Sequence, residues 1–276
     1  MAVEEGQVLP GHALPFVGDC RWLISLDYDD TLRSDDAEQP VSHSFYELMR
    51  SWRAYGVRWG INTGRTLPYL CSELLPTAPF LPDFICTCER YVYIAQEDGK
   101  VSPLVEHNQR CYEHNMCVRE SVTPLLHAQL LLLRQRMPEL QWIIAPDDPL
   151  SVEAENSQTM DAIMAFLAPF VSSLEGVAPQ RAGRYMRLAD SRYCKGSALR
   201  SVAEQWRVPS SHWAIIGDGH NDLRAFQLFP EAFCGAPSTA HPDVLAWLAD
   251  NGGCISSTPG VMEILYTWKP LHMTES

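Results

Sequence analysis

One short stretch near the N-terminus indicates the class of fold: Trp22-Leu23-Ile24-Ser25-Leu26-Asp27-Tyr28-Asp29-Asp30-Thr31. Its first five residues are mainly apolar, which is typical of a buried strand, and the run stops at a group of acidic residues. Ligands bind to open parallel sheets beyond the carboxyl ends of the strands. A strand that ends in Asp27 and Asp29 is therefore predicted to place two carboxylates at a ligand site.

Two other predicted strands also end in polar residues. The strand Val57 to Asn62 is followed by Thr63-Gly64-Arg65, and the strand Trp213 to Ile216 is followed by Gly217-Asp218-Gly219-His220-Asn221-Asp222. If these strands are parallel neighbours, their ends meet at one edge of the sheet. The side chains expected to converge there are Asp27, Asp29, Thr63, Asp218 and Asp222. Four carboxylates in one crevice repel one another unless a cation joins them, and oxygen ligands of this kind suit Mg²⁺.

Lysine is rare in this chain, which makes a lysine beside a motif informative. Only Lys100, Lys195 and Lys269 occur. Lys195 precedes Gly196-Ser197 at the start of a predicted helix, where a fixed positive charge and free backbone donors suit an anion.

Strand and helix alternate at both ends of the chain, whereas the middle follows another pattern. Ser44 and Glu47 form a capping-box signature for a helix that ends near Gly56. A long helix is predicted from about Tyr112 to Arg136, and it opens the first of two helix-strand-strand units that precede Asp190. The sequence predicts an α/β fold in which residues 1–95 and 190–276 form a Rossmann-like core with a parallel sheet, and residues 96–189 form an inserted α+β domain.

The composition excludes several classes of protein. The chain has 276 residues, 46% of them hydrophobic and 20% charged, which excludes wholesale disorder, collagen and coiled coil. No apolar run reaches the roughly 20 residues of a membrane helix. Met1 to Gln7 contains two glutamates and no basic residue, unlike a secretory signal, so a cytoplasmic location is expected. The net charge of −13 and the lack of a basic run argue against a nucleic-acid partner.

The nine cysteines do not have the spacing of a metal site. Cys86 and Cys88 are predicted to lie in one strand with both side chains on the same face. Buried free thiols are the favoured interpretation of these residues, ahead of a metal pair.

Taken together, the four motifs make the chain similar to the haloacid dehalogenase superfamily of phosphohydrolases. The family's D-x-D-x-T motif matches Asp27 to Thr31, and its strand-terminal Ser or Thr matches Thr63. Its lysine matches Lys195, and its G-D-x-x-N-D motif matches Gly217 to Asp222. The motifs occur in the family's order. The sequence departs from the family at Asp30, where many members have Gly, at Gly219, where Ser is common, and at Glu89-Arg90, near an expected Asn-Gly pair.

The resemblance implies a mechanism for each motif. Asp27 would attack phosphorus, and Asp29 would act as general acid and then as general base. Thr63 and Lys195 would hold the phosphoryl oxygens, and Asn221 would orient Lys195 or the phosphate. Mg²⁺ would bind Asp27, the main-chain carbonyl of Asp29 and Asp218, with Asp222 as a ligand through water or as an anchor. The residues assigned to substrate binding are Thr63, Gly64, Arg65, Lys195 and Asn221.

The position of the insertion adds to this resemblance. Only about ten residues separate the first motif from the next helix, so the insertion lies in the long interval between Arg65 and Lys195. The family places its type-two cap there, in the branch of Cof-type and sucrose-phosphate-phosphatase-like enzymes, and Pro82 to Thr87 resembles the latter. An insertion of this size is large enough to cover the mouth of the site. The expected partner is a small phosphorylated metabolite, such as a sugar phosphate.

Several alternatives remain at this stage. A phosphomutase or a non-catalytic phosphosugar-binding protein would use the same motifs, and the oligomeric state is open. His220 admits a contact with substrate or solvent, or a structural role, with the latter favoured. Arg65 could touch substrate, pin the cap hinge or form an ordinary salt bridge. For Arg181, Arg184, Arg187 and Trp142 a solvated or core position is favoured over a substrate role.

Overall fold

The computed structural model describes residues 7–8, 19–33, 40–74, 76–96, 98–146 and 148–268. Lys269 and most of the N-terminal segment Met1 to Gln7 lie outside these residues. The chain divides into two compact units: Met1–Asn108 with Lys195–Ser276, and Gln109–Cys194. These boundaries differ from the predicted ones, which lie after residues 95 and 189.

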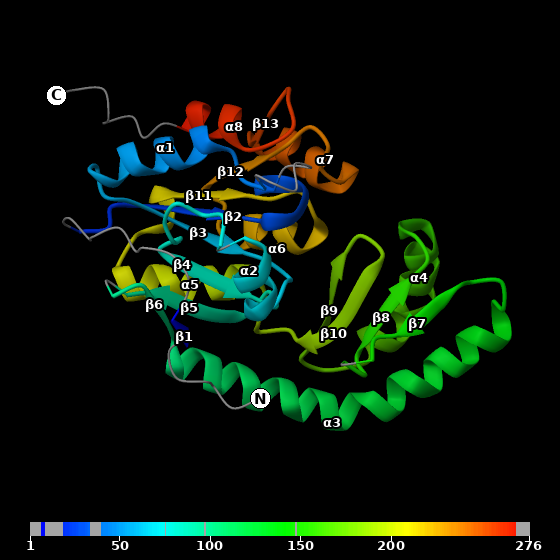
Figure 1. The fold of residues 1–276 in the computed structure, drawn as a ribbon. Helices are drawn as coiled ribbons and strands as arrows, with labels where there is room; N and C mark the ends of the chain where they lie inside the picture. The colour runs from blue at the N-terminus through cyan, green and yellow to red at the C-terminus, as the bar shows by residue number, and fades with distance from the viewer. Residues whose placement is uncertain are drawn as a thin grey trace. The chain divides into compact units, whose positions relative to one another are not determined.

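The first unit is built on a nine-stranded sheet with the order β1-β6-β5-β4-β3-β2-β11-β12-β13 (Figure 1). The bounds of its strands are β1 (Gln7–Val8), β2 (Trp22–Leu26), β3 (Val57–Asn62), β4 (Phe84–Thr87), β5 (Tyr91–Ala95), β6 (Lys100–Pro103), β11 (Trp213–Ile216), β12 (Phe233–Ala236) and β13 (Cys254–Ile255). The strands from β4 to β13 in this order are parallel. β3, β2 and β11 are neighbours, so the three predicted strand ends lie side by side.

The other edge of this sheet is antiparallel, which the predicted parallel sheet did not include. β5 runs antiparallel to β4, and β6 and β1 extend the same edge. Cys88 and Glu89 reverse the chain between β4 and β5, with positive φ angles of 50° and 64°. The prediction that Cys86 and Cys88 share one strand face is therefore wrong, because Cys88 lies in this turn.

Helices cover both faces of the sheet because the buried strands alternate their side chains with a period of two. Ile24 and Leu26 of β2 pack with α1 (His43–Arg53), α2 (Leu67–Glu73) and α8 (Met262–Trp268). Leu23 of the same strand packs on the other face with α5 (Lys195–Trp206), α6 (His220–Leu228) and α7 (Pro242–Asn251). Figure 1 shows α1 and α8 together on one side of the sheet. An apolar layer on each face of the sheet therefore stabilises the strands whose ends form the site.

The start of α1 corrects one sequence prediction. Ser42, and not Ser44, is the N-cap, because its side chain accepts a hydrogen bond from Phe45 N at 3.3 Å. Ser44 lies within the first turn, where its hydroxyl contacts that of Ser42. The helix therefore begins two residues earlier than a Ser44–Glu47 capping box would place it.

The second unit is an α+β layer, shown in green in Figure 1. Its antiparallel sheet has the order β7-β8-β10-β9. These strands are β7 (Trp142–Ile144), β8 (Ser151–Ala154), β9 (Val177–Ala182) and β10 (Tyr185–Asp190). Alternate residues of β8 and β10, such as Val152 and Met186, pack against α3 (Val105–Arg136) and α4 (Ser157–Ser172). The arrangement is the predicted helix-strand-strand doubling, although α3 begins seven residues before the expected Tyr112.

In the part of the chain that the structure describes, no helix is both long enough and apolar enough to be a candidate membrane span.

Candidate active site

Three carboxylates meet at the carboxyl ends of β2 and β11. Asp27 directly follows β2, and Asp218 and Asp222 follow β11 across the loop into α6. One carboxylate oxygen from each of the three lies within 4.8 Å of the others. Asp27 and Asp222 are buried, with 9% and 2% of their surfaces exposed. The pairing of β2 with β11 therefore brings together acids that are almost 200 positions apart in the sequence.

Lys195 lies among these acids. Its Nζ is 2.6 Å from Asp27 Oδ1 and 2.8 Å from Asp222 Oδ1, and only 1% of the residue is exposed. Asn62, the last residue of β3, donates from Nδ2 to the Lys195 carbonyl at 2.9 Å and so holds the start of α5 against the sheet. The predicted lysine is thus a buried, fixed cation in direct contact with two of the acids.

Burial and charge act in opposite directions on Lys195. Burial alone would lower the pKa of its ammonium, but Asp222, Asp27 and Glu89 outweigh burial and raise that pKa above its ordinary value. Lys195 is therefore charged at neutral pH.

Both acids of the fourth motif hold their protons more strongly than a solvated aspartate does. Burial, followed by the charges of Asp27 and Asp222, raises the pKa of Asp218. Burial also raises the pKa of Asp222, and the charge of Lys195 only partly opposes it. A single lysine therefore does not compensate the three acids, and a divalent cation would complete the balance of charge.

Gly217 lets Asp222 reach this position. A Cβ on Gly217 would lie 2.1 Å from Asp222 Cγ, so the Asp222 carboxylate packs directly on the glycine backbone. The Asp222 side chain also accepts from Gly219 N at 3.1 Å, which closes the turn into α6. The first glycine of the motif is thus required for close approach, because any side chain there would displace Asp222.

The segment after Asp27 is a tight turn, Tyr28–Leu32. Asp30 lies in the left-handed region with φ at 56°, which agrees with its interpretation as a turn residue in place of Gly. Thr31, to which sequence analysis assigned no role, donates from Oγ1 to Asp218 Oδ1 at 3.0 Å. Thr31, the last residue of the D-x-D-x-T motif, thus orients Asp218 of the G-D-x-x-N-D motif.

Asp29 lies outside the cluster of three acids and pairs with arginine. Arg65 donates to it from Nε at 2.7 Å and from Nη2 at 3.0 Å, and Arg33 lies 3.7 Å away. The Arg65 guanidinium also lies over the ring of Tyr69. Of the three interpretations of Arg65, the structure shows a salt bridge, and its partner is the predicted acid–base residue.

Glu89, which the sequence marked only as a departure from the family's pattern, lies beside Thr63, Gly64 and Asn221. Glu89 is 5% exposed and accepts from Asn221 Nδ2 at 3.0 Å. A Cβ on Gly64 would lie 3.5 Å from Glu89 Oε1, and Glu89 N donates to the Thr63 carbonyl at 2.9 Å. Asn221 therefore contacts Glu89, and its assignment to orient Lys195 or the phosphate stays a prediction. One signal in the sequence pointed to Glu89: the family's Asn-Gly pair is absent and Glu89-Arg90 lies near its expected place.

The arginines and Trp142 of the second unit have partners within that unit. Arg181 pairs with Asp161 at 2.5 Å, and Arg184 pairs with Glu153 at 2.8 Å. Arg187 differs from the expected solvated residue, because it is buried and donates to Gln180 at 2.9 Å. Trp142 packs against the apolar core, with the Arg134 guanidinium over its ring.

Comparison with known proteins places the chain in a family. A family model described as haloacid dehalogenase-like hydrolase matches residues 87–241, more than half of the chain. The matched segment includes Lys195 and the fourth motif. A search of curated proteins finds no match.

Solved structures share the fold. The sucrose-phosphatase of Synechocystis sp. PCC6803, in complex with sucrose and phosphate, is 17% identical, with a TM-score of 0.64 over 91% of this chain and 97% of that one. A haloacid dehalogenase-like hydrolase from B. subtilis is 17% identical, with a TM-score of 0.55 over 85% and 94%. A phosphoryl-transfer superfamily member with a trigonal-bipyramidal intermediate is 14% identical, with a TM-score of 0.55 over 90% and 98%. At these identities the likeness is one of fold.

Proposed function

This chain belongs to the haloacid dehalogenase-like hydrolases, and from that premise we propose that it is a Mg²⁺-dependent phosphatase of small phosphomonoesters. One observation carries the proposal: carboxylate oxygens of Asp27, Asp218 and Asp222 lie within 4.8 Å of one another, and the Lys195 ammonium contacts Asp27 and Asp222. A buried nucleophile next to a fixed cation and an acidic metal site is the arrangement that transfer of a phosphoryl group requires.

Asp27 and Asp29 have different roles in the proposed reaction. An oxygen of Asp27 attacks phosphorus, the bond from phosphorus to the leaving oxygen breaks, and the departing alcohol takes a proton from Asp29. Asp29 then takes a proton from the water that hydrolyses the aspartyl-phosphate. The carboxylate form of Asp29, which pairs with Arg65, is the form that can accept a proton. To donate one, Asp29 has to be protonated, which disrupts the ion pair.

The remaining residues hold the phosphoryl group and the metal. Lys195 and the Thr63 hydroxyl face its negative oxygens, and Asn221, held by Glu89, orients the group from the first turn of α6. Asp27, Asp218 and the main-chain carbonyl of Asp29 would hold Mg²⁺, with Asp222 directly or through water. When bound, Mg²⁺ supplies the positive charge that lets an anionic nucleophile approach an anionic phosphate.

The leaving group is proposed to be a sugar or a related polyol. The support is the large insertion between Arg65 and Lys195, together with a fold shared with a sucrose-phosphatase. The negative net charge of −13 disfavours polyanions such as nucleic acids.

The test is phosphate release from a panel of small phosphate esters, phosphopeptides and nucleic-acid ends, with Mg²⁺ and with a chelator. We expect the highest kcat/KM on a phosphorylated sugar or related metabolite, activity that depends on Mg²⁺, and a phosphorylated Asp27 peptide after acid quenching. Asp27→Asn should lose about three orders of magnitude of kcat or more while keeping its fold.

Three outcomes would contradict the proposal. These are turnover by Asp27→Asn within about tenfold of the parent, full activity after exhaustive chelation, and a preference for macromolecular esters. Product analysis adds a further check, because a phosphomutase would return the phosphoryl group to a sugar and release little phosphate.

A further inference from the structure

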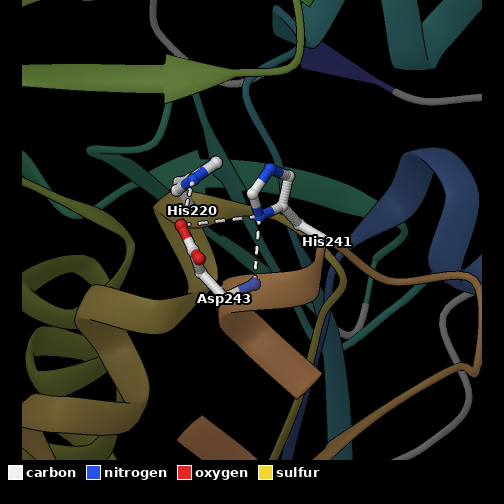
Figure 2. A group of neighbouring side chains, drawn as sticks. All are labelled: His220, His241 and Asp243. Carbon is white, nitrogen blue, oxygen red and sulfur yellow. Dashed lines mark hydrogen bonds and ion pairs between the residues drawn. The ribbon is translucent and has the colours of Figure 1, made fainter. Parts of the chain in front are cut away.

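A second group of metal-ligating side chains lies in the first unit, outside the three acids of the active site. It consists of His220, His241 and Asp243 (Figure 2). His220 is the first residue of α6, His241 is the N-cap of α7, and Asp243 lies in the first turn of α7. Two helix starts thus direct two imidazoles and a carboxylate toward one another.

Two of the three distances in this group are close to those of a tetrahedral ligand set. His220 Nε2 is 3.2 Å from Asp243 Oδ2, and His241 Nδ1 is 3.7 Å from the same oxygen. Zinc binds nitrogen and oxygen at about 2.0–2.1 Å, so two ligands of a tetrahedral ion lie roughly 3.3 Å apart. One ligand atom from each of the three residues lies within 4.8 Å of the others. An ion bound to Asp243 Oδ2 would therefore lie within reach of both imidazoles after the side chains adjust.

The backbone fixes two of the three residues. His241 N donates to the Asp218 carbonyl at 2.9 Å, which ties the start of α7 to the loop of the fourth motif. Asp243 N donates to His241 Nδ1 at 3.2 Å, so this nitrogen carries a lone pair, as a metal ligand must. A metal would replace that hydrogen bond. The Asp243 carboxylate offsets the positive ends of the two helices.

Among the described residues of the first unit, the two groups of metal-ligating side chains differ in chemistry. The active-site group offers only carboxylate oxygens and one ammonium, a set that suits Mg²⁺. Two imidazoles and one carboxylate suit zinc and similar transition metals. His220 and His241 are partly exposed, and Asp243 has 66% of its side chain exposed, so water can complete the coordination.

We propose that His220, His241 and Asp243 form a second divalent-metal site, of the zinc type, separate from the Mg²⁺ site of the proposed reaction. The bound ion joins the first turns of α6 and α7 and thereby braces the loop that carries Asp218. The role of this ion is structural. Its presence can therefore be measured by metal binding and by protein stability, without an assay of enzyme activity.

The test is a titration of the full chain with Zn²⁺ in competition with a chromogenic chelator, in excess Mg²⁺ to occupy the oxygen site. We expect one zinc ion per chain and a raised Tm. His241→Asn keeps a side-chain acceptor at the N-cap and removes the imidazole, so it should weaken binding at least tenfold with little loss of fold. His220→Asn and Asp243→Asn should do the same.

His43→Asn is the matched control, because His43 is an exposed histidine beside a carboxylate, Glu47, at 3.3 Å. It should bind zinc as the parent does. Diffraction at the zinc absorption edge should place the ion between the two imidazoles. The proposal is overturned if the parent binds no zinc in excess Mg²⁺. It is also overturned if the three variants bind as tightly as the parent, or if Asp27→Asn abolishes the binding. Because none of these measurements uses turnover, they are independent of the proposed phosphatase activity.

Discussion

At the scale of single residues, Lys195 determines the balance of charge in the active site. Its ammonium contacts both Asp27 and Asp222, and it is 1% exposed. A buried cation with two anionic partners cannot be removed without leaving those carboxylates uncompensated. Its loss should therefore affect both catalysis and folding.

We expect Lys195→Met, which keeps much of the side-chain volume, to lower kcat by about 10²-fold or more and to destabilise the fold by about 3–5 kcal/mol. Steady-state kinetics and urea unfolding measure the two effects. Lys100→Ala is the control, because Lys100 is exposed and pairs with Asp98 on the surface. Similar losses in both variants would show that Lys195 has no special role.

Gly217 supports a second prediction at this scale. In Gly217→Ala the new Cβ would lie 2.1 Å from Asp222 Cγ, and the Asp222 carboxylate is buried and held by Lys195 Nζ and Gly219 N. Asp222 should therefore move away from Lys195. Calorimetry should show weaker Mg²⁺ binding, and unfolding should show lower stability.

Gly219→Ala is the comparison within the same loop. Its Cβ would come too close to one atom, Asn221 Oδ1 at 2.7 Å, whereas Asp222 Oδ2 at 3.7 Å is at an ordinary contact distance. Asn221 Oδ1 is the far end of a side chain, so it can shift at the expense of the hydrogen bond to Glu89. The effect should be clearly smaller than at Gly217. A larger effect at Gly219 would contradict the close-packing argument.

At the scale of elements, the sequence predicted the strands that position the active site. β2, β3 and β11 have their predicted bounds, because each is a mainly apolar run that ends at polar residues. The first turns of α3 were missed. Asn108 there bonds to both the amide and the carbonyl of Val92, and His107 bonds to the Arg90 carbonyl. These contacts with β5 and its turn depend on the tertiary fold, so a local pattern could not reveal them.

In the candidate active site, too, the sequence predicted the features that a local motif marks and missed those that depend on the tertiary fold. Sequence motifs identified Asp27, Lys195 and Asp222, which the structure brings into contact. They did not identify the Arg65–Asp29 ion pair or the Glu89–Asn221 hydrogen bond. Each of those depends on the exact direction of a loop, and Glu89 depends on a left-handed turn that residue types alone do not specify.

The start of α1 offers a prediction at this scale. Ser42 accepts from Phe45 N, so Ser42→Ala should cost about 1 kcal/mol of unfolding free energy. Ser44 is exposed within the first turn, so Ser44→Ala should change stability by less than about 0.5 kcal/mol. Urea unfolding of the two variants distinguishes them. A larger loss of stability in Ser44→Ala than in Ser42→Ala would show that Ser44 is the N-cap.

At the scale of the whole molecule, the active-site acids link global stability to pH and to divalent cations. The pKa values of Asp218 and Asp222 are raised in the folded protein, first by burial and then by neighbouring charge. In the unfolded chain these acids have ordinary values near 4. Between that value and the raised ones, the folded state binds more protons than the unfolded state, so stability falls as pH rises.

This linkage predicts how Mg²⁺ should stabilise the protein. A divalent cation must displace the protons held by Asp218 and Asp222, so its binding is weaker at low pH. The rise in Tm on adding Mg²⁺ to chelator-treated protein should therefore be larger at about pH 8 than at about pH 6. Calorimetric scans at both pH values measure it. Asp218→Asn removes one of the titrating acids and should reduce both the Mg²⁺ effect and its dependence on pH. An equal or smaller rise at the higher pH in the parent would mean that the acids are ionised without a cation, and that Lys195 alone balances their charge.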